Sequence, residues 1–256
     1  MPTLIFDIET IGENFDSMDE TTQSVLTRWV DRDVSDKKEK KDKIQEIKNS
    51  TALSPLTGEI VAIGVLDSAT KNGAVYYQSP ETQANESQMQ ILVNQIALSD
   101  DKIDGNKKKE GVIKLKPMSE KEMLEQFWQL AIKYDAFVSF NGRSFDVPFM
   151  LLRSAIHKII PSKDLMSNRY LNSQKFNAKH IDLFDQFSFY GSAGRKGNLH
   201  LFCRAFGIKS PKQGVCGSDV GNFFAKRKYK EIAEYNVGDI VATDELYQYW
   251  EKYLRF

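Results

Sequence analysis

Two acids stand two positions apart near the start of the chain, in the apolar stretch TLIFDIET. In a β-strand, residues two apart point to one face, so the carboxylates of Asp7 and Glu9 would project together. Two like charges on a buried strand cost free energy unless a cation neutralises them, and hard divalent cations prefer carboxylate oxygens. The pair therefore indicates a metal site. A strand that ends at Phe6 and leaves both acids solvated fits these two residues equally well.

Two further acids have the spacing for the same chemistry. Tyr235 and Asp239 are four apart in EIAEYNVGDIVATDEL, so a helix places them on one face. For this pair alone, a buried tyrosine hydroxyl bonded to the aspartate for packing is the favoured interpretation. Asp146 follows an expected strand and precedes Val-Pro, which is also typical of an ordinary helix N-cap. A catalytic interpretation of either motif depends on the other acids.

The order of these motifs resembles the DEDD superfamily of 3′→5′ exonucleases. LIFDIET, FNGRSFDVPFM and YNVGD match its three motifs, and Tyr-x-x-x-Asp marks the tyrosine subclass. The histidine subclass would have His at position 234, where Glu stands. Together with GEIVAIGV, SEKEMLEQFW and LFCRAFGIKSPKQGVCGSDV, these segments look like the stand-alone exonucleases related to the proofreading domain of family B DNA polymerases. The resemblance covers most of residues 1–11 and 53–250. Asn236 stands where many relatives have Cys, and this departure alters none of the expected metal ligands.

The resemblance implies a two-metal phosphodiester hydrolase. Two Mg²⁺ or Mn²⁺ ions would be held by four carboxylates, with Asp7 bridging both ions. Glu9 and Asp239 would hold the ion that activates water, Asp146 would help to hold the other, and Tyr235 would orient the attacking water. The substrate is the 3′ end of a single strand, DNA or RNA, and the product is a nucleoside 5′-monophosphate. The residues expected to contact substrate are Asn141, Phe145 and Lys212.

The helices and strands that must position these residues are predicted from the spacing of apolar residues and from the turn and capping residues between them. Strands are predicted at 3–8, 58–69, 73–78, 112–116 and 135–140, and residues 80–111 are expected to form a polar surface loop. A capping box at Ser119 and Glu122 predicts a helix over 119–133, and apolar spacing predicts another over about 229–254. The expected fold class is α/β, an RNase H-like mixed five-stranded sheet flanked by helices.

One segment has few of the apolar residues from which a packed core is built. Residues 13–50 contain SDKKEKKDKIQEIKNS, which is dense in charge and nearly free of aromatic residues. It is interpreted as a solvated helix or a mobile excursion within a single exonuclease domain over 1–256. Because it offers little apolar area to bury, residues 31–50 are expected to be dispensable for catalysis.

Composition excludes several classes of protein. Hydrophobic residues make up 41%, which rules out general disorder, and 35 basic residues balance 35 acidic ones. The two cysteines form no CxxC, so neither they nor the three scattered histidines predict zinc chemistry. No signal peptide or membrane span is expected, and a reduced, cytoplasmic protein without membrane partners fits best.

Asp182 and Asp185 are interpreted as helix-start or surface acids.

Two other functions remain open from the sequence. A non-catalytic nucleic-acid-binding module on the same fold would not need four acids and the tyrosine. An exoribonuclease of the RNase D type shares the tyrosine subclass, and no residue that reads a 2′-hydroxyl is evident. Protein partners are not indicated by any motif.

Overall fold

A single mixed sheet organises the molecule. The computed structural model describes residues 1–79, 86–94, 108–193, 197–210 and 219–255. The sheet has seven strands in the order β4-β5-β3-β2-β1-β6-β7. β1 pairs antiparallel with β2 and parallel with β6, so it lies inside the sheet. The strands are β1 (Thr3–Gly12), β2 (Gly58–Asp67), β3 (Gly73–Tyr77), β4 (Ser87–Asn94), β5 (Lys108–Pro117), β6 (Ala136–Ser139) and β7 (Lys179–Asp182).

The prediction of five strands is wrong by two, both at the sheet edges. β4 lies in the segment expected to be a loop, and β5 begins four residues earlier than predicted. Along β4 only alternate residues turn inward, ending with Ile91 and Val93, while the residues between them are polar or exposed. An edge strand with one solvated face carries too few apolar residues to stand out in a polar sequence. β7 is only four residues long, KHID.

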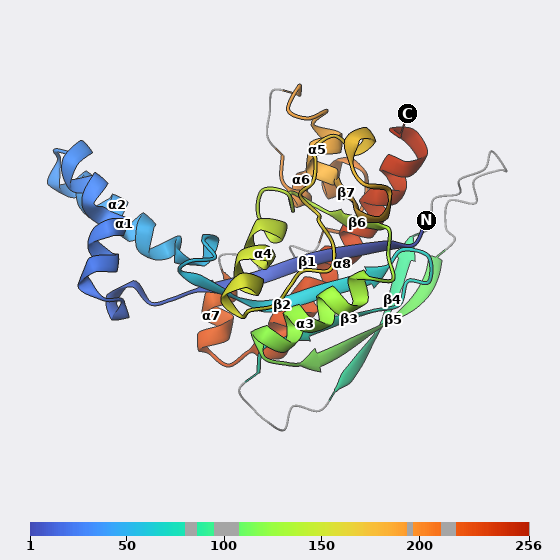
Figure 1. Cartoon of the computed structure of the whole chain (residues 1–256), viewed down its shortest axis with the longest axis horizontal. Helices are drawn as coiled ribbons and strands as arrows, with labels where there is room; N and C mark the ends of the chain where they lie inside the picture. Colours follow the sequence, from blue (N-terminus) through green and yellow to red (C-terminus); the bar gives the residue numbers. More distant parts are fainter. Residues whose placement is uncertain (80–85, 95–107, 194–196, 211–218, 256) are drawn as a thin grey trace.

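Helices cover both faces of the sheet (Figure 1). Leu4, Phe6 and Ile8 of β1 pack with α3 and α4 on one face, whereas Ile5 packs with α8 on the other. The capping box predicted at Ser119 is present, and the backbone N–H of Ser119 donates to Glu122 Oε2 at 2.8 Å. The helices on the body are α3 (Glu120–Ala131), α4 (Asp146–Ile156), α5 (Leu183–Phe187), α6 (Leu199–Ala205), α7 (Val220–Ala225) and α8 (Tyr229–Tyr253).

The charged segment forms two helices that project from the sheet (Figure 1). α1 (Glu20–Asp33) and α2 (Lys37–Asn49) are capped at their N-termini by the side chains of Asp19 and Asp36. No residue of α2 is buried, in agreement with the expectation of a solvated helix. Short 3₁₀ turns complete the chain at Phe15–Ser17, Thr51–Leu53, Leu171–Ser173 and Phe176–Ala178. Among the described residues, no helix is long and apolar enough to cross a membrane.

A buried ion pair joins α8 to the sheet. Lys71, in the turn between β2 and β3, contacts Asp244 of α8 at 2.5 Å, and the two side chains are 3% and 0% exposed. Asp244 also accepts hydrogen bonds from Ser68 Oγ at 2.8 Å and Gln248 Nε2 at 3.1 Å. The pair therefore fixes the position of α8, the helix that carries Tyr235 and Asp239.

We predict that Lys71→Met destabilises the protein by about 3–5 kcal/mol, because it leaves the carboxylate of Asp244 buried without its cation. Lys230→Met is the matched control, since Lys230 pairs with Glu234 on the same helix with both side chains largely exposed. That substitution should cost less than about 1 kcal/mol. Urea denaturation of both variants measures the difference, and equal midpoints would contradict the prediction.

Candidate active site

Three carboxylates from the two ends of the chain meet between β1 and α8. Asp7, Glu9 and Asp239 each offer an oxygen, and these oxygens all lie within 4.8 Å of one another. Glu9 and Asp239 are 8% and 6% exposed, and Asp7 is partly buried. The strand does not end at Phe6, so the interpretation of Asp7 and Glu9 as solvated acids is wrong. Their alternation along β1 puts both on the face that α8 covers.

Close packing holds α8 against the acids. Asp7 stands opposite Gly64 of β2, and a Cβ at Gly64 would lie 2.0 Å from Asn236 Oδ1 of α8. Glycine at this position therefore lets the helix approach the strand closely. The pairing of β1 with β2 is irregular just after Glu9, where Thr10 pairs with Ile60 instead of continuing the register. The acids thus occupy the last regular stretch of the central strand.

The carboxylates disfavour one another's ionisation. Burial raises the pKa of Asp7 well above its ordinary value, and the charges of Asp146, Asp239 and Glu9 raise it further. The pKa of Glu9 is likewise raised, first by burial and then by Asp239 and Asp146. An all-oxygen cluster of this kind suits a hard divalent cation, whose charge would offset both effects. The donor set therefore fits Mg²⁺ or Mn²⁺.

Asp146 lies beside this group. It is the first residue of α4 and is 3% exposed, and its Oδ1 accepts a hydrogen bond from Ile8 N at 3.0 Å. Phe145 occupies the N-cap position and makes no side-chain cap, so the N-cap interpretation of Asp146 is wrong. Burial raises the pKa of Asp146 to about 7, against the lowering effect of the Ile8 hydrogen bond. Its carboxylate is thus hydrogen-bonded to β1, the strand that carries Asp7 and Glu9.

The loop before Asp146 is held by an acid that the sequence analysis interpreted differently. Asp182 accepts hydrogen bonds from Asn141 N at 2.8 Å and Arg143 N at 2.9 Å, and it also caps α5 through Phe184 N. The helix-start interpretation of Asp182 is confirmed, but the residue is 2% exposed and is not a surface acid. Asp185 is also buried and pairs with Arg169 at 2.5 Å. Asn141 itself has a left-handed backbone, with φ of 65°.

The other residues considered in the sequence analysis are Tyr235, Phe145, Lys212 and His180. Tyr235 is half-buried on α8, one turn before Asp239. Phe145 is half-buried, and its ring centroid lies 5.5 Å from that of Phe149. Lys212 lies outside the described residues. His180, to which no chemistry was assigned, is buried and hydrogen-bonds Ser139 Oγ at 2.7 Å.

Asn236 is a site residue that the sequence analysis missed. Its Nδ2 donates to Asp7 Oδ2 at 2.9 Å, and its amide also lowers the pKa of Glu9 by hydrogen bonding. The side chain is fully buried, and Oδ1 has no hydrogen-bond partner. Asn236 is not one of the expected ligands, but it contacts one of them, Asp7. Its place three residues before Asp239 on one helix face is the signal that predicts the contact.

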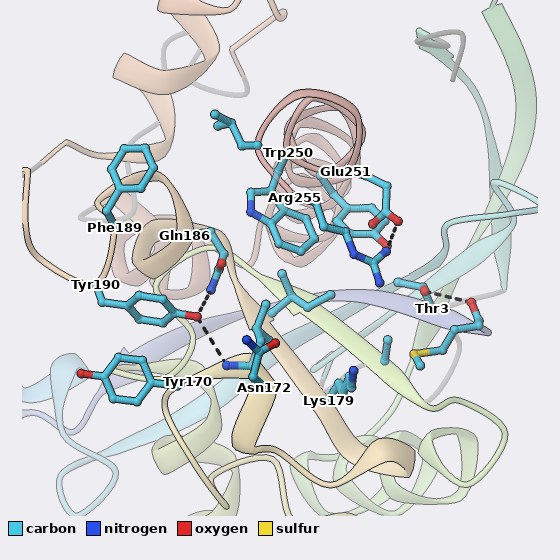
Figure 2. A pocket seen from close by; sticks show the side chains of 16 residues that line it. Thr3, Tyr170, Asn172, Lys179, Gln186, Phe189, Tyr190, Trp250, Glu251 and Arg255 are labelled. Atoms are coloured by element: carbon cyan, nitrogen blue, oxygen red, sulfur yellow. Dashed lines mark hydrogen bonds and ion pairs between the residues drawn. The ribbon is translucent and has the colours of Figure 1, made fainter. Parts of the chain in front are cut away.

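Two cavities of the structure differ in their relation to the acids. A cleft of about 860 Å³ contains Glu9 and Phe145 and extends between β1, α2 and α7. A second cavity of about 470 Å³ opens at the start of β1, where Thr3, Lys179 and Trp250 line it (Figure 2). None of the four acids lines this second cavity. Of these two cavities, the cleft is the one that includes an acid of the cluster, Glu9.

We predict that metal-free Asp146→Asn is more stable than the unsubstituted protein at pH 8. Between pH 3.8 and about 7 the unfolded chain releases the Asp146 proton and the folded chain keeps it, so stability falls as pH rises through this interval. Asparagine removes this loss, which is on the order of 2–4 kcal/mol. Thermal melts in a chelator at pH 4 and pH 8 measure it. A difference between the two proteins that does not grow with pH would contradict the prediction.

We also predict that Asn236→Ala weakens Mn²⁺ binding by roughly 10–100-fold, because the amide orients two candidate ligands. The melting temperature should change little, since the substitution also removes a buried oxygen without a partner. Asn172→Ala, at an exposed asparagine that lines the other cavity, is the control and should leave Mn²⁺ affinity unchanged. Calorimetric titration gives the affinities, and unaltered binding in Asn236→Ala would show that the contact is incidental.

The chain is similar to known proteins in sequence and in fold. A family model described as "Predicted 3'-5' exonuclease related to the exonuclease domain of PolB" matches residues 86–255. The fold is similar to that of the family B DNA polymerase from the hyperthermophilic archaeon Pyrobaculum calidifontis, with a TM-score of 0.54 and 14% identity. The similarity covers 98% of this chain and 24% of the polymerase, so the chain spans about a quarter of the polymerase's length. No curated protein matches the chain in sequence. The fold is α/β and RNase H-like, and the chain belongs to the family of predicted 3′-5′ exonucleases related to the exonuclease domain of PolB.

Proposed function

We propose that the protein is a metal-dependent 3′→5′ exonuclease that releases nucleoside 5′-monophosphates from the end of a single strand, with DNA as the favoured substrate. The observation that carries the proposal is the convergence of Asp7, Glu9 and Asp239 within 4.8 Å, in a buried cluster beside Asp146. A protein that only bound nucleic acid would gain nothing from four acids that oppose one another's ionisation. The family to which the chain belongs supports the same reaction.

The four acids would hold two ions, one at the cluster of three carboxylates and one between Asp7 and Asp146. Asp7, Glu9 and Asp239 would hold one Mg²⁺ or Mn²⁺ ion, and Asp7 and Asp146 would hold a second. Bound there, the ions would supply an activated water and offset the charge on the scissile phosphate. Asn236 keeps Asp7 in place from α8, and the backbone of Ile8 keeps Asp146 in place from β1. The chain's own contacts thus orient the ligand oxygens before any ion arrives.

The residues around the acids have separate tasks in this proposal. Tyr235, one turn from Asp239, orients the attacking water through its hydroxyl. Phe145 lines the cleft with Glu9 and stacks on a terminal base, as aromatic side chains do in single-strand sites. Asn141, in the turn before α4, contacts the strand, and Lys212 binds a phosphate.

The test is incubation with Mg²⁺ and 5′-labelled single-stranded DNA and RNA of matched sequence. A ladder of shortened products on DNA supports the proposal, and a ladder on RNA alone supports an RNase D-like exoribonuclease. Binding without shortening of either strand would indicate a non-catalytic module and would refute the proposed reaction. Chromatography of the released nucleotide distinguishes a 5′-monophosphate from other products.

We predict that Asp7→Ala and Tyr235→Phe fail in different ways. Asp7→Ala removes the acid that faces the other three, so hydrolysis should fall to background and Mn²⁺ affinity should collapse. Tyr235→Phe removes one hydroxyl and no charge, so turnover should fall roughly 10²–10⁴-fold with near-normal Mn²⁺ affinity. Turnover, Mn²⁺ affinity and melting temperature are measured on both variants. Wild-type turnover in a stable Tyr235→Phe protein would exclude the orienting role.

A further inference from the structure

Residues 31–50, which include α2 of the helical hairpin α1–α2, were expected to be dispensable for catalysis, yet α2 forms one wall of the cleft that contains Glu9. Gln45, Lys48 and Asn49 of α2 line this cleft of about 860 Å³. Phe145, at the start of α4, and Asn222, of α7, line it as well. The end of α2 therefore faces the same space as a carboxylate of the acidic cluster, although about forty residues separate them along the chain.

The base of the hairpin is fixed to the end of β1. Thr10 Oγ1 donates to Ala52 O at 2.8 Å, and Glu13 N donates to Thr57 O at 2.8 Å. A Cβ at Gly12 would lie 2.0 Å from Thr51 Oγ1, so the outgoing and returning chains touch there. These contacts hold the end of α2 in a set position relative to Glu9.

The chemistry of this wall suits nucleobases and not phosphates. Lys48 is the basic residue among those lining the cleft, and it pairs with Asp16 at 2.5 Å and lies 5.2 Å from the centre of the Phe15 ring. The cleft also contains Glu9, Glu13 and Asp16, so its charge opposes phosphate. Its remaining polar groups include the side-chain amides of Asn14, Gln45, Asn49 and Asn222.

Two side-chain amides near the end of α2 can hydrogen-bond a base edge. Gln45 Nε2 donates to Asn49 Oδ1 at 2.9 Å, and the carbonyl oxygen of Gln45 and the amide hydrogens of Asn49 are the groups that this bond does not use. Base edges carry both donors and acceptors, and side-chain amides are the usual partners of such edges. Phe145, in the same cleft, offers a surface on which a base can stack.

We propose that the end of α2 is a substrate clamp that holds the bases of the strand's 3′-terminal nucleotides through Gln45 and Asn49. The clamp rests on the proposed exonuclease function, because it is built into the same cleft. It would place bases against α2 and Phe145 and leave the backbone directed at the acids. The charged insertion then belongs to the substrate-binding machinery.

The experiment compares Gln45→Ala/Asn49→Ala, the amide variant, with Lys41→Ala/Asp42→Ala, the control variant. The control also carries two alanine substitutions on α2, at exposed positions that do not line the cleft. Affinity for a fluorescent 10-nucleotide single strand is measured by anisotropy in a chelator, where no hydrolysis occurs. The amide variant should bind roughly 10-fold more weakly and the control variant normally. Because the amides do not contact phosphate, the dependence of affinity on salt should be the same in both.

Two further arms separate the possible failures. In Mg²⁺, KM for hydrolysis of the 10-nucleotide strand should be roughly 10-fold higher in the amide variant than in the unsubstituted protein. A strand with abasic 3′-terminal positions should not distinguish the amide variant from the unsubstituted protein. If the amide variant and the unsubstituted protein bound the 10-nucleotide strand with all its bases equally well, the clamp would be overturned. Failure of the unsubstituted protein to hydrolyse the 10-nucleotide strand would overturn the proposed function, and the binding result would then decide the clamp by itself.

Discussion

The repulsion among buried carboxylates is the constraint on which the rest of the site depends. Burial and mutual charge raise the pKa values of Asp7, Glu9 and Asp146, so the fold must hold these groups together at a cost in stability. The two apolar cores do this, because β1 is packed on one face against α3 and α4 and on the other against α8. Neutral groups, the Asn236 amide and the Ile8 backbone, then fix the orientation of the oxygens.

How much of this was visible in the sequence depended on whether the signal was local. Alternation along one strand placed Asp7 and Glu9 on one face, and helical spacing placed Tyr235 one turn before Asp239 on α8. The capping box at Ser119 was likewise a local pattern. In each case the geometry of a single element decides which side chains share a face, so no knowledge of the tertiary fold is needed.

The errors arose where a residue's role depends on a distant partner. Asp146 had the local signature of an N-cap, but its carboxylate bonds to β1, which is 138 residues away. Asp182 and Asn236 were misjudged for the same reason, since their partners lie on other elements. The edge strand β4 was missed because its polar face resembles a loop. No periodicity within one segment carries such information, and only the packed structure supplies it.

The separation between Asp7 and Asn236 along the chain determines when the acidic cluster can form. The two residues that meet at the acidic cluster are 229 positions apart, and Asp239 lies just beyond Asn236. During synthesis, β1 leaves the ribosome long before α8 has been made. A partly synthesised chain therefore cannot assemble the cluster, and contacts of such long range also close late and slowly in folding. The topology therefore delays assembly of the acidic cluster until α8 has been made and has packed against β1.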